Sequence, residues 1–269
     1  MQWGRSRGAA LRWGIAGAIV GLIVGVVVFA PAAWLANAGA SASDGRLLLA
    51  DARGTVWSGS ATLVLTGGPG SRDARSLPGR MSWTMGLDGT ALRVRARHAC
   101  CLNGTVGLLL RPGLGRFSVT LMPPPDGWVG QWPSAWLGGL GTPFNTLQLG
   151  GTMRVVTRGI TFETVRGRWR VDGRADLELL GVSSSISTLP TLGSYRLTLA
   201  GDEANPGTAT LSLATLEGAL QLSGSGSSSS AGVRFRGEGS AAPGSEAALS
   251  NLLNIIGRRD GARTVISIG

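Results

Sequence analysis

Few residues in this chain have the chemistry that an active site or a metal site needs. The sequence holds a single histidine, His98, and two adjacent cysteines, Cys100 and Cys101. One histidine excludes a pair of imidazole ligands within the chain, and the three residues match no zinc-site spacing. Neighbours on a strand point to opposite faces, so we expect the two cysteines to be badly placed for a mutual disulfide. We interpret them as small residues in or beside a strand, with an intermolecular disulfide as the alternative.

The acidic residues indicate no catalytic pair. Asp172, Asp176 and Glu178 are closely spaced, and the last two would share one solvated strand face beside arginines. A glycosidase uses such a pair, and a serine triad could use His98, but nothing else in the sequence favours either chemistry. The sequence has no lysine for a Walker loop, no G-x-G-x-x-G and no G-x-S-x-G. We therefore predict a protein that is not an enzyme, with no catalytic, cofactor-binding or metal-binding residues.

All of the positive charge comes from arginine. The formal net charge is +10 and all 25 basic residues are arginine, which genomic GC bias also produces. The two densest groups are Arg93, Arg95, Arg97 and Arg166, Arg168, Arg170. On a strand, this alternating spacing places each group on one solvated face. A phosphate, headgroup or nucleic-acid surface is the alternative. Because basic and aromatic residues do not interleave, we predict no nucleic-acid partner.

An apolar segment near the start of the chain predicts a membrane helix. No charge lies between Arg12 and Asp44, and about 20 apolar residues suffice to cross a hydrocarbon core of about 30 Å. We assign residues 1–12 to a basic cytoplasmic tail and residues 13–36 to a single transmembrane helix, because arginines favour the cytoplasmic side. A signal peptide cleaved near residues 36–40 is the alternative, but the long apolar run favours an uncleaved anchor. Either way, the remaining chain is exported.

Three glycines within this segment form a candidate helix-packing face. Gly17, Gly21 and Gly25 recur every four residues and so fall on one side of a helix. Small residues there would let a second membrane helix approach closely. The alternative is that small residues are simply frequent in this chain.

From residue 45 onward the sequence predicts many short strands. Apolar and polar residues alternate within short stretches, and Gly, Pro, Asn or Asp separate one stretch from the next. This pattern is typical of antiparallel strands with one buried face. The expected strands are 61–66, 81–85, 91–97, 106–110, 116–121, 147–157, 160–171, 175–180, 195–200, 208–214, 219–223 and 233–236. The predicted fold class is mainly β: one transmembrane helix, then an antiparallel curved sheet or sandwich that forms a periplasmic domain over residues 45–269.

Residues 123–143 interrupt the strand pattern. They hold three consecutive prolines and the tryptophans Trp128, Trp132 and Trp136. We interpret the segment as a crossover or a short helix that begins near Pro133, between two halves of the domain. The tryptophans could plug the end of a sheet or form a binding patch.

Two later segments also depart from the pattern. The Ser/Gly run at 224–232 is polar and predicts a flexible hairpin loop. Apolar residues recur at helical spacing over 245–256, with Ser245 as the expected N-cap and Gly257 as the stop. A short C-terminal helix and a last strand at 263–268 are therefore expected.

Four segments together resemble the type II secretion system protein N family. They read GTVWSGSA at 54–61, LGSYRL at 192–197, EGALQLSG at 217–224 and LLNIIGRR at 252–259. Their order, the chain length and the single N-terminal anchor with PAAWL at 31–35 carry the resemblance, which covers nearly the whole chain. It implies an AsmA-like long bent sheet with an apolar inner face.

The resemblance also implies a function and partners. It implies an accessory, non-enzymatic inner-membrane component of the type II secretion system that contacts other components of that machine, in the membrane or the periplasm. No catalytic residues come with that family. The alternative is an AsmA-like lipid-handling or outer-membrane assembly protein whose apolar groove holds acyl chains. Lipid that co-purifies with the chain, with normal secretion in a deletion strain, would favour the alternative.

Overall fold

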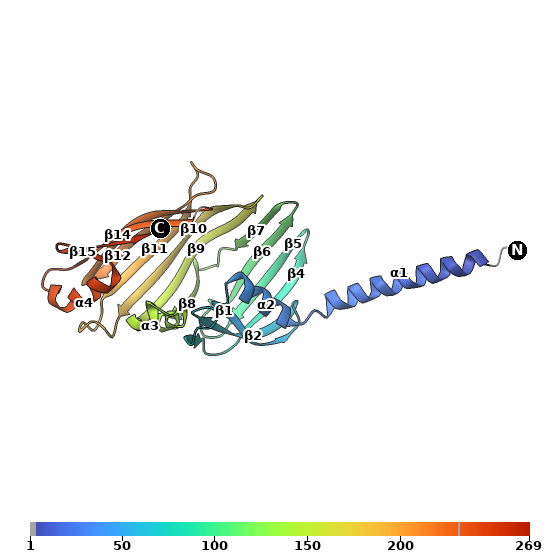
Figure 1. Ribbon diagram of the computed structural model, residues 1–269, viewed down its shortest axis with the longest axis horizontal. Helices are drawn as coiled ribbons and strands as arrows, with labels where there is room; N and C mark the ends of the chain where they lie inside the picture. Colours follow the sequence, from blue (N-terminus) through green and yellow to red (C-terminus); the bar gives the residue numbers. More distant parts are fainter. Residues whose placement is uncertain (1–3, 231) are drawn as a thin grey trace.

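The structure is a computed structural model that describes residues 4–230 and 232–269. Helix α1, Gly4–Val28, projects from one end of the molecule (Figure 1). Its segment Leu11–Val28 has a mean hydropathy of 2.2 and is not buried against any other described residue. By length and composition this helix could cross a membrane. Of the predicted basic tail, residues 1–3 lie outside the described residues and residues 4–12 are part of α1.

The predicted membrane segment 13–36 divides between two helices. Helix α1 ends at Val28, and a second helix, α2, runs over Ala32–Ala42. Pro31 takes the N-cap position of α2 with an extended backbone, φ −68° and ψ 147°. Proline has no N–H to donate to the preceding turn and restricts the residue before it, so the first helix cannot continue through this point.

Three backbone and side-chain contacts fix the end of α1 to the sheet. The indole Nε1 of Trp57 donates to the carbonyl of Val27 at 2.7 Å. The backbone N–H of Val56 donates to the carbonyl of Ala30 at 2.8 Å, and Pro31 forms an isolated bridge with Thr55. The turn between the first two strands therefore holds the helix end in a defined position.

The strands form one open sheet. They are β1 Leu47–Gly54, β2 Ser58–Thr66, β3 Ala74–Ser76, β4 Met81–Asp88, β5 Ala91–His98, β6 Thr105–Gly113, β7 Arg116–Leu121, β8 Trp128–Pro133, β9 Gly150–Val165, β10 Arg168–Ser183, β11 Gly193–Gly201, β12 Ala209–Gly218, β13 Leu220–Ser229, β14 Gly232–Ala241, β15 Arg258–Asp260 and β16 Arg263–Ile268. Over the described residues this is a 16-stranded sheet in the order β1-β2-β4-β5-β6-β7-β9-β10-β11-β12-β13-β14-β16-β15. Strand β3 also pairs with β2, and β8 with β9.

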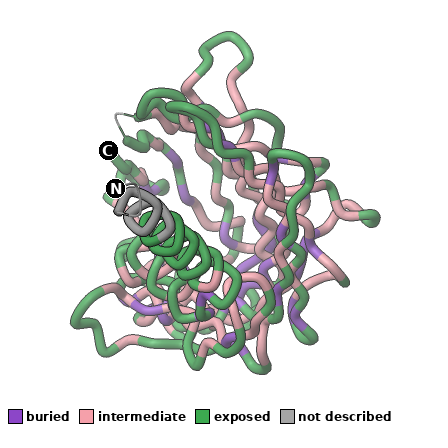
Figure 2. The backbone as a smooth tube through the Cα atoms, turned by 90° about the vertical axis from the view of Figure 1, so that its right-hand side faces the viewer, coloured by how far each residue is buried: buried purple, intermediate pink, exposed green. Residues whose placement is uncertain are grey.

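Every pairing between these named strands is antiparallel, and the two ends of the sheet do not close on each other. Figure 2 views the molecule from the α1 end, with the exposed helix in front of the sheet. The predicted mainly β fold, with an N-terminal apolar helix, an antiparallel sheet and a short C-terminal helix, is confirmed.

The predicted break between strands 147–157 and 160–171 is wrong. Strand β9 runs without a turn to Val165, and the hairpin turn falls at Arg166 and Gly167, whose φ angles are 48° and 79°. Two positive φ values suit the tight hairpin turns that match strand twist. Gly159, where we expected the break, stays inside β9 because Gly173 of β10 approaches it closely. A Cβ on Gly173 would lie 2.3 Å from the Gly159 carbonyl oxygen.

The prediction of a flexible loop at 224–232 is also wrong for residues 224–229. Strand β13 continues to Ser229 and pairs with both β12 and β14, while residue 231 lies outside the described residues. Gly224 is required by packing: a Cβ there would lie 2.5 Å from the Phe235 ring. Glycine at this position thus makes room for the Phe235 ring within the sheet. The Ser/Gly composition of residues 224–229 is therefore compatible with a strand.

The segment 123–143 contains more regular structure than we expected. The short helix near Pro133 is confirmed as the 3-10 helix η1, Ser134–Leu140, with Pro133 as its N-cap. The preceding strand β8 was not predicted. A further short helix, α3, covers Phe144–Leu147.

The C-terminal helix is confirmed as α4, Glu246–Ile256, which ends at Gly257. Ser245 occupies the N-cap, but its side chain makes no capping hydrogen bond. The arginines after α4 form the edge strand β15, which was not predicted, and the expected last strand 263–268 is confirmed as β16.

Two separate clusters form the core. The cluster at the α4 end contains Leu147, Val182, Leu192, Tyr195, Leu220, Leu249, Leu252 and Leu253. Within it, the Tyr195 hydroxyl donates to the Leu220 carbonyl at 3.0 Å. The cluster at the α2 end is smaller and contains Ala32, Ala61, Trp83 and Val94.

We predict that α4 is needed to stabilise the C-terminal part of the sheet. Leu249 is fully buried, so Leu249→Ala should lower the free energy of unfolding by about 2–5 kcal/mol. Ile255 on the same helix is 49% exposed, and Ile255→Ala should cost less than about 1 kcal/mol. Urea unfolding of both variants in detergent, followed by circular dichroism, measures the difference. Equal effects would contradict this packing.

Candidate binding groove

An apolar groove of about 500 Å³ lies on one face of the N-terminal part of the sheet. Three neighbouring strands provide much of its wall through every second residue. These residues are Met81, Trp83 and Met85 of β4, Val94, Ala96 and His98 of β5, and Val106, Leu108 and Leu110 of β6. Because side chains alternate across a strand, the same three strands send their other residues to the opposite face.

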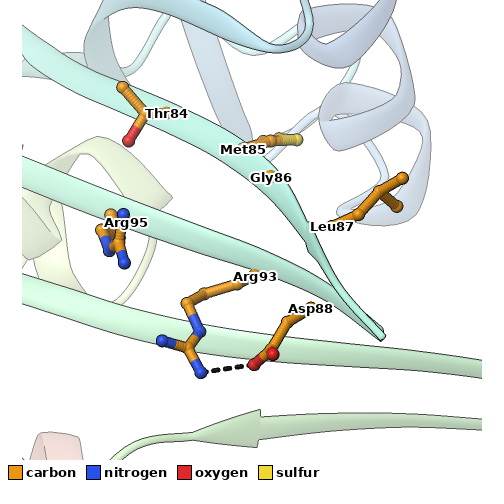
Figure 3. Close-up of a pocket in the computed structure, with 7 residues that line it drawn as sticks. All are labelled: Thr84, Met85, Gly86, Leu87, Asp88, Arg93 and Arg95. Carbon is orange, nitrogen blue, oxygen red and sulfur yellow. Dashed lines mark hydrogen bonds and ion pairs between the residues drawn. The ribbon is translucent and has the colours of Figure 1, made fainter. Parts of the chain in front are cut away.

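The opposite face carries the predicted arginine group of β5. Arg93 forms an ion pair with Asp88, and both lie with Arg95 around a shallow polar depression (Figure 3). Arg97 donates from Nε to the Thr105 hydroxyl. The prediction that these three arginines share a face away from the apolar side is confirmed.

The second arginine group does not share one strand face. Arg166 lies in the turn between β9 and β10, so only Arg168 and Arg170 are on β10. Arg170 pairs with Asp172 at 2.9 Å. The prediction was wrong for Arg166 because the turn comes later in the chain than the sequence pattern indicated.

Helix α2 forms part of the groove wall. Leu35 and Gly39 of α2 contribute to its lining, and α2 follows α1 directly. Helix α2 packs against β1, which also lines the groove.

Two of the three clustered tryptophans lie in the groove. Trp132 of β8 and Trp136 of η1 contribute to its wall, and the Trp136 indole N–H donates to the Arg75 carbonyl at 2.9 Å. Trp128 lies elsewhere, with the Arg154 guanidinium 5.8 Å from its ring centroid, within range of a cation–π contact. The cluster thus divides between a groove wall and a separate surface contact.

The turn after β5 brings His98, Cys100 and Cys101 together, and of these three residues His98 lines the groove. His98 is buried, and burial lowers its pKa below the ordinary value. Its Nδ1 accepts a hydrogen bond from the Cys100 backbone N–H at 3.3 Å. Cys100 and Cys101 form a disulfide with each other. Our expectation that they could not bridge is wrong, because they lie in a turn, where neighbouring side chains are not forced to opposite faces.

Strand β8 holds this turn in place. The backbone N–H of Gln131 donates to the Cys101 carbonyl at 2.9 Å, and Leu102 forms an isolated bridge with Gly130. A Cβ on Gly130 would lie 2.4 Å from the Cys101 carbonyl oxygen, so the approach requires glycine. Strand β8, within the segment 123–143 that we interpreted as a crossover or a short helix, therefore supports the cysteine turn.

The three acidic residues each pair with an arginine. Asp176 contacts Arg174 at 3.0 Å, and Glu178 contacts Arg196 of β11 at 2.9 Å. Partial burial raises the pKa of Asp176, but hydrogen bonds from Thr198 and Arg174 outweigh burial and the net shift is downward. Glu178 with Arg196, and Asp176 with the Thr198 hydroxyl, join β10 to β11.

The candidate helix-packing face stands apart from the groove. A Cβ placed on Gly17, Gly21 or Gly25 would meet no described atom outside α1 within 4 Å. The face is open to another helix, and its role stays a prediction.

Comparison with known protein families identifies the domain that carries the groove. The family model described as "Type II secretion system (T2SS), protein N" matches residues 45–266. The chain belongs to this family. The match spans nearly the whole sheet and α4, which hold most residues of both core clusters and most of the groove wall. No curated protein matches the chain, and neither does any solved structure.

Membership in the protein N family supports an accessory role in type II secretion. The sequence segments that suggested the family lie at structurally important points. Trp57 contacts the end of α1, Tyr195 is buried in the larger cluster, and Leu252 belongs to α4. The family resemblance implied an apolar inner face, and its alternative an apolar groove, but the residues that line the groove were not predicted.

Proposed function

We propose that this protein is an accessory, non-enzymatic component of the type II secretion system, anchored in the inner membrane by α1. In this proposal the sheet domain lies in the periplasm and acts through contacts with other components of the machine. The match to protein N across residues 45–266 carries the proposal. The apolar helix supports the anchor, since its surface has no protein covering among the described residues.

The connection between helix and sheet supports a role that depends on position. Trp57 and Val56 hold the end of α1, so the sheet cannot turn freely above the membrane. A domain held in this way presents the same surfaces to neighbouring components at all times. Such pre-organisation lowers the entropy cost of association.

The two sheet edges differ in how well they would accept a partner strand. Edge strand β15 consists of Arg258, Arg259 and Asp260, all exposed, and charged edge residues discourage strand addition. Edge strand β1 begins with the apolar residues Leu47, Leu48 and Leu49. We infer that a partner would add to β1 rather than to β15.

The glycine face of α1 is the proposed contact within the membrane. Gly21→Leu should weaken co-purification with the other secretion components at least several-fold, because the added side chain holds a partner helix away. In a strain that lacks the native gene, the same variant should restore secretion less well than the wild type. Ala16→Leu is the matched control, since it adds a leucine to the same helix about 140° around the axis. Full co-purification of Gly21→Leu would remove this contact from the proposal.

A second candidate function is the binding of one lipid acyl chain. The observation that favours it is the apolar groove, whose volume of about 500 Å³ lies within the range of small-molecule sites. Its wall includes Leu35 and Gly39 of α2, next to the membrane helix. The nearest source of a long apolar ligand is therefore the bilayer around α1.

The acyl-chain proposal predicts a difference between two adjacent leucines. Leu108 lines the groove, whereas Leu109 is absent from its wall and pairs with Arg93 across the strands. Leu108→Gln should weaken binding of a fluorescent fatty acid about tenfold or more, because a polar amide would enter an apolar site. Leu109→Gln should bind as the wild type does.

Equal affinity of the two variants would contradict acyl binding in this groove. Secretion assays separate this candidate from the first. Normal secretion by a Leu108→Gln variant that no longer binds fatty acid would show that lipid binding is not needed for secretion.

A further inference from the structure

The turn after β5 gathers the softest ligand atoms of the chain in one place. One ring nitrogen of His98 and the Sγ atoms of Cys100 and Cys101 all lie within 4.8 Å of one another. The sequence contains no other histidine or cysteine. The three residues are therefore the chain's whole supply of imidazole and thiol ligands.

A second observation at the same place concerns His98 alone. His98 is only 4% exposed, and its Nε2 atom is buried without a hydrogen-bond partner among the described residues. Buried polar atoms are nearly always satisfied, so an unpaired one calls for an explanation such as an ion that binds there in another state. The Nδ1 atom, in contrast, already accepts the Cys100 N–H.

Strands β8 and β4 lie on two sides of the three residues. Strand β8 supports the turn through the Cys101 carbonyl. On the other side, Met81 of β4 is the direct cross-strand partner of His98, and both side chains line the apolar groove. A thioether is a further soft donor, and the rest of this groove wall is apolar apart from His98.

We propose that the reduced form of this turn binds one Cu(I) ion through the thiolates of Cys100 and Cys101 and the imidazole of His98, and that the disulfide is the ion-free form. Thiolate ligands select soft cations, of which Cu(I) is one. A structural Zn(II) site normally needs four protein ligands, and this cluster offers three. Hard cations such as Mg²⁺ and Ca²⁺ prefer oxygen ligands, which the cluster lacks.

The change between the two forms needs a reductant, for which a protein dithiol is sufficient. Its thiolate attacks a sulfur of the disulfide, and exposed Cys100 is the accessible one. The dithiol loses two electrons and two protons and becomes a disulfide, while Cys100 and Cys101 become two thiols. Cu(I) then replaces the two thiol protons. Neutral His98 offers the lone pair of Nε2 once its ring proton moves from Nε2 to Nδ1, and this move breaks the hydrogen bond from the Cys100 N–H to Nδ1. Copper keeps its oxidation state throughout.

The experiment uses the full chain in detergent. A phosphine reduces the protein, the phosphine is removed without oxygen, and Cu(I) is titrated in competition with the chromophoric chelator bicinchoninate. We expect the reduced chain to take up one equivalent of Cu(I) and the oxidised chain to take up none. The double variant Cys100→Ser, Cys101→Ser should also take up none, with an unchanged circular dichroism spectrum.

Two single variants test the other donors. His98→Asn should weaken Cu(I) binding at least tenfold, whereas Met81→Leu, which removes a soft atom from the same groove, should change it less than threefold. The proposal is overturned if the reduced wild type takes up no Cu(I), or if the double serine variant binds Cu(I) as tightly as the reduced wild type. Unchanged binding by His98→Asn would remove the imidazole from the site.

Discussion

An open antiparallel sheet must bury one of its two faces, and this molecule depends on how that face is covered. At the C-terminal end, α4 covers it with Leu249, Leu252 and Leu253, which complete a dense cluster. At the N-terminal end, α2 has the sequence AAWLANAGASA, whose side chains are mostly small. It covers only part of the face. The apolar groove is the space that remains between this thin helix, η1 and the strands.

The same difference explains why the two ends of the molecule suit different tasks. The α4 end buries its apolar surface and gains stability from it. The α2 end keeps apolar surface accessible in the groove, and this surface contributes less to stability than buried surface does. The contacts of Trp57 and Val56 with the end of α1 set the position of the sheet relative to that helix.

Sequence alone predicted the elements whose pattern is local. Alternation identified β5, β7 and β16, and helical spacing identified α4, because each of these elements shows one apolar side in its own residues. Pairing was harder to predict. The turn at Arg166 and the packing of Phe235 over Gly224 depend on the neighbouring strand, so Gly159 and the Ser/Gly run were misinterpreted as breaks.

The lining of the groove and the geometry of the cysteine turn could not be predicted for a related reason. The groove depends on how α2, η1 and three strands meet, and no stretch of sequence contains that information. The two cysteines were assigned strand geometry, whereas the turn that β8 holds allows them to bridge. The family segments were recognisable, but their structural roles became clear only from the contacts of Trp57 and Tyr195.

The account rests on the sheet domain lying outside the inner membrane while α1 stays within it. The most direct measurement is protease treatment of intact spheroplasts from cells that express the chain with a C-terminal epitope tag. The account predicts that external protease removes the tagged domain without lysis and leaves a cytoplasmic marker protein intact. Protection of the tagged domain until the cells are lysed would contradict the account, because the groove and the proposed contacts would then face the cytoplasm.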